Sequence, residues 1–98
     1  MAFSIKKTAD NLVCIAGELD LLTVPEVKKQ TMGLFNGVSE LQFDLSAVSQ
    51  SNSVALALIL EWMKMADKHR VSLSFNHFPE HLRELARVYG IEQDLKIV

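Results

Sequence analysis

Apolar and polar residues alternate in four short segments of the chain. Residues 3–5 and 12–15 follow the two-residue period of β-strands, and they are joined near Ala9-Asp10-Asn11. These two segments predict an opening hairpin. The same period returns at 41–45 and 71–75, where we expect a third and a fourth strand, each with one face in the core.

Three further segments have the spacing of amphipathic helices. The first begins near Thr23, which has Glu26 three residues later in capping-box spacing, and it continues to about Phe35. The second covers 54–69 without a helix-breaking residue, after a polar segment that ends the third strand. The third opens at proline and closes at glycine, over residues 79–90.

The resulting order is β-β-α-β-α-β-α, with a short last strand expected at 95–98. Strands that alternate with helices indicate one sheet with crossover helices packed on it. A chain of 98 residues fits one domain. We therefore predict a single α/β domain over residues 1–98, with a mixed β-sheet of four to five strands and three to four helices.

Charge and composition exclude several classes of partner. Lys and Arg number 10 against 12 Asp and Glu, and no stretch gathers the positive charges, so we expect no nucleic-acid binding. The longest strictly apolar run, 54–60, falls well short of the roughly 20 residues that span a bilayer. The single cysteine, Cys14, makes no internal disulfide and is typical of a reduced, cytosolic setting.

Residue types that carry catalysis or bind metals have structural explanations here. His77 and His81 are four residues apart, but Pro79 starts a helix between them, so we do not expect a shared metal-binding face. Glu18 and Asp20 flank the start of the first helix, where acidic groups favour the helix dipole. The sequence shows no polar set specific for a small ligand. We expect a non-enzymatic protein with no metal and no cofactor.

The second predicted helix is apolar around its whole circumference at its front end. Residues 54–60 point in every direction around the axis, and the polar face begins only at Glu61. Either a loop or neighbouring helix covers the extra apolar side, or that side is a docking surface. In the second case Trp62, beside Leu58, is a candidate interface anchor.

The segment before this helix, 49–53, is rich in residues that cap helix N-termini. Ser53 is explained most simply as the cap. The alternative is functional, because the free N–H groups of a helix N-terminus favour a phosphate or an acidic group of a partner. Phosphorylation of Ser53 would add about −1.5 to −2 charges beside the apolar surface and disrupt a hydrophobic contact.

Three segments in this order carry a family resemblance. Asp44–Val48, Asn52–Leu60 and the Gly-Glu-Leu-Asp segment at 17–20 resemble the STAS domain family, which sulphate-transporter tails and anti-sigma factor antagonists share. Ser53 takes the position of the phosphorylatable Ser or Thr. The chain departs from the pattern at Asn52, where the family has Asp, and at Val54, where it has Gly. A kinase that reads this loop would lose an acidic partner and meet a β-branched side chain.

The segments 58–62, 73–75 and 79–91 are most similar to the stand-alone MlaB-type STAS subunits of bacterial phospholipid ABC transporters, which maintain outer-membrane lipid asymmetry. The resemblance implies a cytoplasmic subunit, peripheral to the inner membrane through its complex, that binds the transporter ATPase and supports its assembly and activity. It places Ser53 at that contact. An anti-sigma factor antagonist regulated by serine phosphorylation is the alternative function, and self-association of the isolated chain stays open.

The expected contact combines the loop before the second helix with the front of that helix. Ser53 and Asn52 form its regulatory part. The remaining interface residues expected there are Ser51, Val54, Ala57, Leu58, Glu61 and Trp62.

Overall fold

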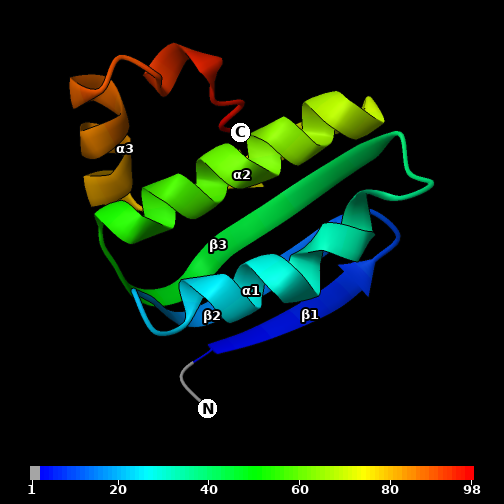
Figure 1. Cartoon of the computed structure of the whole chain (residues 1–98), viewed down its shortest axis with the longest axis horizontal. Coiled ribbons are helices and arrows are strands. Elements are labelled where there is room, and N and C mark those ends of the chain that lie inside the picture. The colour runs from blue at the N-terminus through cyan, green and yellow to red at the C-terminus, as the bar shows by residue number, and fades with distance from the viewer. Residues whose placement is uncertain (1–2) are drawn as a thin grey trace.

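The computed structural model describes residues 3–98. The elements are β1 (Phe3–Ala9), β2 (Leu12–Leu19), α1 (Val24–Thr31), the 3-10 helix η1 (Met32–Phe35), β3 (Glu40–Ser51), α2 (Ser53–His69), β4 (Ser72–Asn76), α3 (Glu80–Val88) and the 3-10 helix η2 (Glu92–Asp94). This order confirms the predicted β-β-α-β-α-β-α succession (Figure 1).

The four strands form one mixed sheet in the order β1-β2-β3-β4. β1 and β2 pair antiparallel as the predicted hairpin, with Ile5 opposite Ile15. β2 pairs parallel with β3, and β3 pairs parallel with β4. The expected last strand is reduced to a single bridge between Phe75 and Ile97 beside β4. The α/β fold class with a mixed sheet is therefore confirmed.

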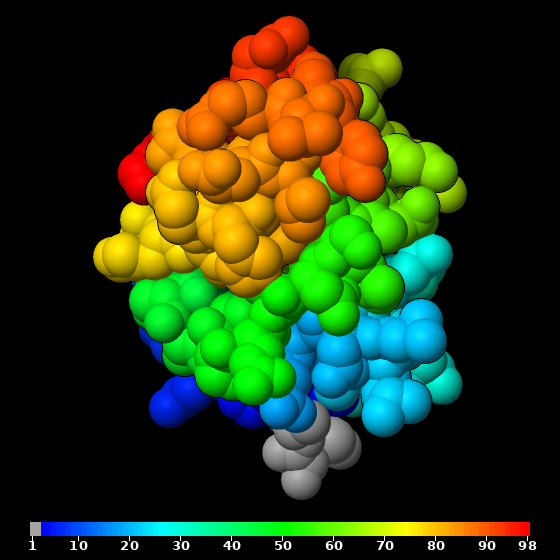
Figure 2. Space-filling view, turned by 90° about the vertical axis from the view of Figure 1, so that its left-hand side faces the viewer, coloured from blue at the N-terminus to red at the C-terminus, as the bar shows by residue number. Residues whose placement is uncertain are grey.

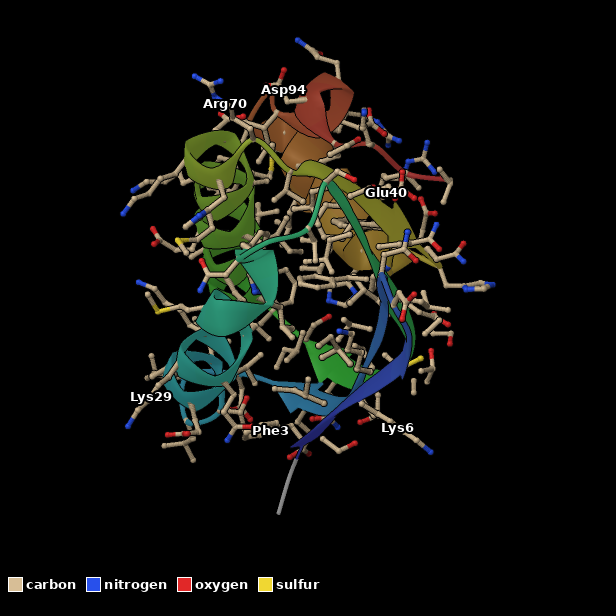
Figure 3. The ribbon with its side chains drawn as sticks, turned by 90° about the vertical axis from the view of Figure 1, so that its right-hand side faces the viewer. Phe3, Lys6, Lys29, Glu40, Arg70 and Asp94 are labelled. Carbon is tan, nitrogen blue, oxygen red and sulfur yellow. The ribbon has the colours of Figure 1, made fainter. Side chains whose placement is uncertain are left out.

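Helices α1 and α2 cover one face of the sheet (Figure 1). Side chains fill the space between these helices and the strands, whereas Lys6 on β1 points away from them (Figure 3). Alternation along the strands produces this arrangement, because Leu41, Phe43 and Leu45 are buried while Gln42 and Asp44 between them are only half-buried. The core thus lies between the sheet and its two covering helices.

Aromatic rings occupy the centre of this core. The rings of Phe43 and Trp62 are 4.3 Å apart between centroids and meet edge to face. The ring centroids of Phe35 and Phe75 lie 6.1 and 6.3 Å from that of Phe43, and both pairs also meet edge to face. The indole Nε1–H of Trp62 donates a 2.8 Å hydrogen bond to Thr31 Oγ1, so α1 and α2 are linked by a buried polar contact.

The start of α1 differs from the predicted capping box. Thr23 precedes the helix but makes no side-chain cap, because its hydroxyl donates to the Glu18 carbonyl (2.7 Å) and accepts from the Asp20 N–H (3.0 Å). Asp20 instead stabilises the turn that leads into the helix, since its Oδ1 accepts from the N–H groups of Leu22 and Thr23. The predicted helix also ends early and continues to Phe35 as the 3-10 helix η1.

The polar segment expected to end the third strand is itself part of that strand. β3 extends to Ser51 because β2 supplies a parallel partner from Gln42 onward, ending with the pair Leu19 and Ser51. The pairing is irregular between Cys14 and Ala16 and again between Gly17 and Glu18. Main-chain pairing thus compensates for the polar side chains, and β3 carries the chain directly to the start of α2.

Candidate functional site

The candidate site lies where the parallel strands end. Leu19 of β2 is paired with Ser51 of β3, so the turn after β2 and the start of α2 leave the sheet side by side. The side view of the molecule shows the segments around residues 20, 50 and 80 on one face (Figure 2). We call this face the carboxyl-edge surface and define it by Leu21, Leu22, Ser51, Asn52, Ser53 and His81.

Asn52, not Ser53, caps helix α2. Its Oδ1 accepts a 3.0 Å hydrogen bond from the Val54 N–H, and its backbone is extended as an N-cap requires. Ser53 is consequently the first residue of the helix, and its side chain is exposed. The explanation of Ser53 as the cap is therefore wrong, and its hydroxyl is presented to solvent at the positive end of the helix dipole.

His81 of α3 connects this surface to the end of β3. Its Nε2 lies 2.7 Å from the Ser51 carbonyl oxygen and 2.9 Å from Ser51 Oγ. A carbonyl oxygen only accepts, so Nε2 carries the proton in this contact. His81 is exposed, and its contact with Ser51, thirty residues away in the sequence, was not predicted.

Three further members of the expected interface remain accessible to different extents. Ala57 is exposed, and Val54 is half-buried against the core. Glu61 is half-buried and bridges two lysines, with Lys28 at 3.1 Å and Lys64 at 3.5 Å. The Lys28 ammonium, as hydrogen-bond donor and as charge, holds the pKa of Glu61 below its usual range. Glu61 therefore links α2 to α1 at the surface.

Leu58 and Trp62 are core residues, and their expected place at the interface is wrong. Each is only 1% exposed. They lie on the helical stripe that faces the sheet, with Ala55 three residues before Leu58 and Ala66 four residues after Trp62. Most of the apolar circumference is thus covered by the sheet and neighbouring helices, and the exceptions are Ala57 and Leu60, the latter 38% exposed.

Two neighbouring leucines on the carboxyl-edge surface were not among the interface residues predicted from the sequence. Leu21 is 72% exposed and Leu22 is 88% exposed, in the turn between β2 and α1. The signal in the sequence was the placement of two large apolar residues between Asp20 and Thr23, which are turn-forming and helix-starting residues. Apolar residues inside such a turn do not belong to the buried face of a strand or helix, so their side chains are expected to be exposed to solvent.

A separate polar contact lies on the sheet face opposite the helices. Asp44 Oδ1 accepts from the Ser46 N–H at 2.9 Å and lies 3.2 Å from His77 Nδ1. The Ser46 hydrogen bond is the main cause that lowers the pKa of Asp44, and His77 adds to it. His77 adopts a left-handed backbone, with φ of 55°, next to this carboxylate. This pair fixes the loop after β4.

Replacing Asp44 by asparagine is expected to lower the free energy of unfolding near pH 7 by about 1 kcal/mol, because the carboxylate is a stronger acceptor than the amide. A lowered pKa in the folded state means that this stabilisation is present above the ordinary pKa and is lost as the pH falls through the lowered one. Urea denaturation should show the difference between variant and parent shrinking on acidification. Asp10→Asn, in the exposed turn after β1, is the matched control. A difference that is constant with pH would contradict the charge explanation.

Within residues 3–98, no three His, Cys, Asp or Glu side chains are grouped so that they could hold a metal ion. None of the helices in this described part combines the length and the apolarity that crossing a membrane requires.

Comparison with known proteins identifies the family. The family model described as "Mlab, STAS domain" matches residues 3–98. The anti-sigma-B factor antagonist of Bacillus subtilis (strain 168) is 28% identical over 88 residues, which cover 90% of this chain and 81% of that protein.

The Bacillus anti-sigma factor antagonist SpoIIAA has the same fold. Its unphosphorylated form matches with a TM-score of 0.75 at 17% identity, over 99% of this chain and 88% of that one. Its phosphorylated form matches with a TM-score of 0.73 at 17% identity, over 99% and 91% of the two chains. The family match extends over every described residue, and the chain belongs to the MlaB-type STAS domain family.

Proposed function

We propose that this chain is a non-enzymatic, cytoplasmic STAS subunit that binds the ATPase of a phospholipid ABC transporter and supports its assembly and activity. The observation that carries the proposal is the match of the MlaB-type family model along residues 3–98. The exposed start of α2, with Asn52 as cap and Ser53 as first helical residue, supports a contact at this position. The chain reaches the inner membrane only through its complex.

The proposed mechanism is contact without turnover. A subunit that binds one conformation of the ATPase stabilises that conformation by mass action and shifts the working equilibrium toward it. Residues 51–54 and Ala57 form the contact on this side. Leu58 and Trp62 support it from the core by fixing the position of α2.

Ser53→Asp is expected to weaken binding to the ATPase subunit by about tenfold or more, because the added carboxylate loses its hydration in the contact, while no buried residue of this chain changes. Ser53→Ala should weaken it less. The measurement is titration calorimetry with the purified ATPase subunit. Ser4→Asp, on the exposed side of β1, makes the same charge change away from the surface and serves as control. Binding of Ser53→Asp as tight as that of the parent chain would refute this placement.

Anti-sigma factor antagonism is the second candidate function, and the relationship to the Bacillus subtilis anti-sigma-B factor antagonist favours it. The exposed Ser53 hydroxyl is accessible to a kinase. Incubation with an anti-sigma factor kinase and ATP, followed by mass spectrometry, separates the two functions. Stoichiometric phosphate on Ser53 would favour the antagonist, whereas its absence together with ATPase binding supports the transporter subunit.

A further inference from the structure

The turn between β2 and α1 is fixed by hydrogen bonds and exposes two leucine side chains to solvent. Asp20 Oδ1 accepts from the Leu22 N–H at 2.9 Å and from the Thr23 N–H at 3.1 Å. The Thr23 hydroxyl, in a residue only 7% exposed, donates to the Glu18 carbonyl at 2.7 Å. The turn is thus fixed from both ends, and Leu21 and Leu22 are displayed on it with most of their side-chain area exposed.

A hydrogen-bonded turn that displays two adjacent large apolar side chains is not explained by folding. Neither leucine joins the core, which lies between the sheet and helices. The bonds that fix the turn use the main-chain N–H groups of Leu22 and Thr23 and the side chains of Asp20 and Thr23, but no leucine side chain, so serine at either leucine position would fold equally well. Adjacent exposed apolar residues beside polar ones are the usual mark of a contact site.

The turn belongs to the same surface as the proposed ATPase contact. Leu19, two residues before Leu21, is paired with Ser51, and Ser53 follows Ser51 by two residues. Because both strands run in the same direction, both connections leave the same edge of the sheet. Figure 2 shows the turn and the start of α2 on one face.

The charges around the turn indicate which kind of partner could bind the two leucines. Glu18, Asp20 and Glu26 surround the two leucines along the chain. An anionic lipid surface would be repelled by three carboxylates. A second copy of this chain, in a two-fold contact through the turn, would bring the same carboxylates face to face. A different protein, with an apolar pocket bordered by cationic side chains, fits both the leucines and the acids.

We infer that Leu21 and Leu22 are hydrophobic anchors that insert into an apolar pocket with a cationic rim on the transporter ATPase. This inference rests on the proposed function and extends the contact from the start of α2 to the β2–α1 turn. The two leucines supply apolar contact area, and the acidic residues beside them set the orientation of the partner.

The test compares binding of the ATPase subunit to the parent chain and to the double variant Leu21→Ser/Leu22→Ser by titration calorimetry. The double variant is expected to bind at least tenfold more weakly. Val88→Ser, at an equally exposed valine at the end of α3, is the control and should bind as the parent does. Thermal unfolding followed by circular dichroism should show both variants as stable as the parent.

The outcomes separate the anchor from the proposed function. If the parent chain and the double variant bind the ATPase equally tightly, only the inference that the leucines are anchors is wrong. If the parent chain does not bind the ATPase, the proposed function itself is wrong. Two further measurements test the other occupants. Sedimentation of the parent, but not of the double variant, with phosphatidylethanolamine–phosphatidylglycerol vesicles would assign the leucines to lipid. A dimer of the parent that the double variant converts to monomer, seen by light scattering, would assign them to a second copy.

Discussion

Replacing Trp62 by alanine is expected to lower the free energy of unfolding by about 3–5 kcal/mol. The indole is 1% exposed and packs edge to face on Phe43, with ring centroids 4.3 Å apart. Its removal leaves a cavity at the centre of the core and an unsatisfied Thr31 contact. For a domain of this size the loss is a large part of a total stability of roughly 5–15 kcal/mol, and it should be measured by urea denaturation followed by circular dichroism.

Two further variants serve as comparisons for the effect of Trp62→Ala on stability. Leu60→Ala removes a large apolar side chain from the same helix, but at a position 38% exposed, and should cost much less. Trp62→Phe keeps an aromatic ring in the core and is expected to fold. It therefore provides a measurable variant if Trp62→Ala does not fold. If the Trp62→Ala variant were as stable as the parent chain but bound the ATPase less tightly, the assignment of Trp62 to the core would be wrong and Trp62 would belong to the interface.

The contrast between Trp62 and Ser53 separates two roles within one helix. α2 buries the stripe that contains Leu58 and Trp62, and it exposes its first residue, Ser53. Substitutions in the stripe act through folding, whereas substitutions at the helix start act on the surface. Binding data for α2 variants are therefore interpretable only beside their unfolding free energies.

The order of elements was predictable because each element carries its own period. The alternation at 41–45 and the unbroken helical segment 54–69 are local patterns, and the structure has a strand and a helix at both. The buried stripe of α2 was also present in the sequence, at the spacing of Ala55, Leu58 and Trp62. The prediction that Leu58 and Trp62 face a partner gave too little weight to that spacing.

Features that depend on a partner distant in sequence were not predictable. β3 extends through polar residues to Ser51 because β2 pairs with it there. The contact of His81 with Ser51 requires the placement of α3 across the end of β3. The capping box failed at Thr23 because its hydroxyl bonds to Glu18, while Asp20 stabilises the turn before the helix. In each case a tertiary or turn hydrogen bond outweighed the local motif.

Thr31→Val is expected to lower the free energy of unfolding by about 1–3 kcal/mol, although the two side chains are similar in shape. Thr31 is fully buried, and its hydroxyl donates to the Val27 carbonyl at 2.8 Å while it accepts from Trp62 Nε1 at 2.8 Å. Valine leaves the indole N–H buried without an acceptor. The cost is therefore the desolvation of that donor rather than lost packing.

A double-mutant cycle with Trp62→Phe isolates this hydrogen bond from the packing around it. Phenylalanine has no N–H, so Thr31→Val should cost less in the Trp62→Phe background than in the parent chain. The difference between the two costs, measured by urea denaturation, is the coupling of the α1 hydroxyl to the α2 indole. Equal costs in both backgrounds would mean that Thr31 acts only through its hydrogen bonds to the Val27 and Lys28 carbonyls, since these are present with either ring at position 62. A positive coupling instead means that this buried hydrogen bond between Trp62 and Thr31 helps to set the orientation of α1 against α2.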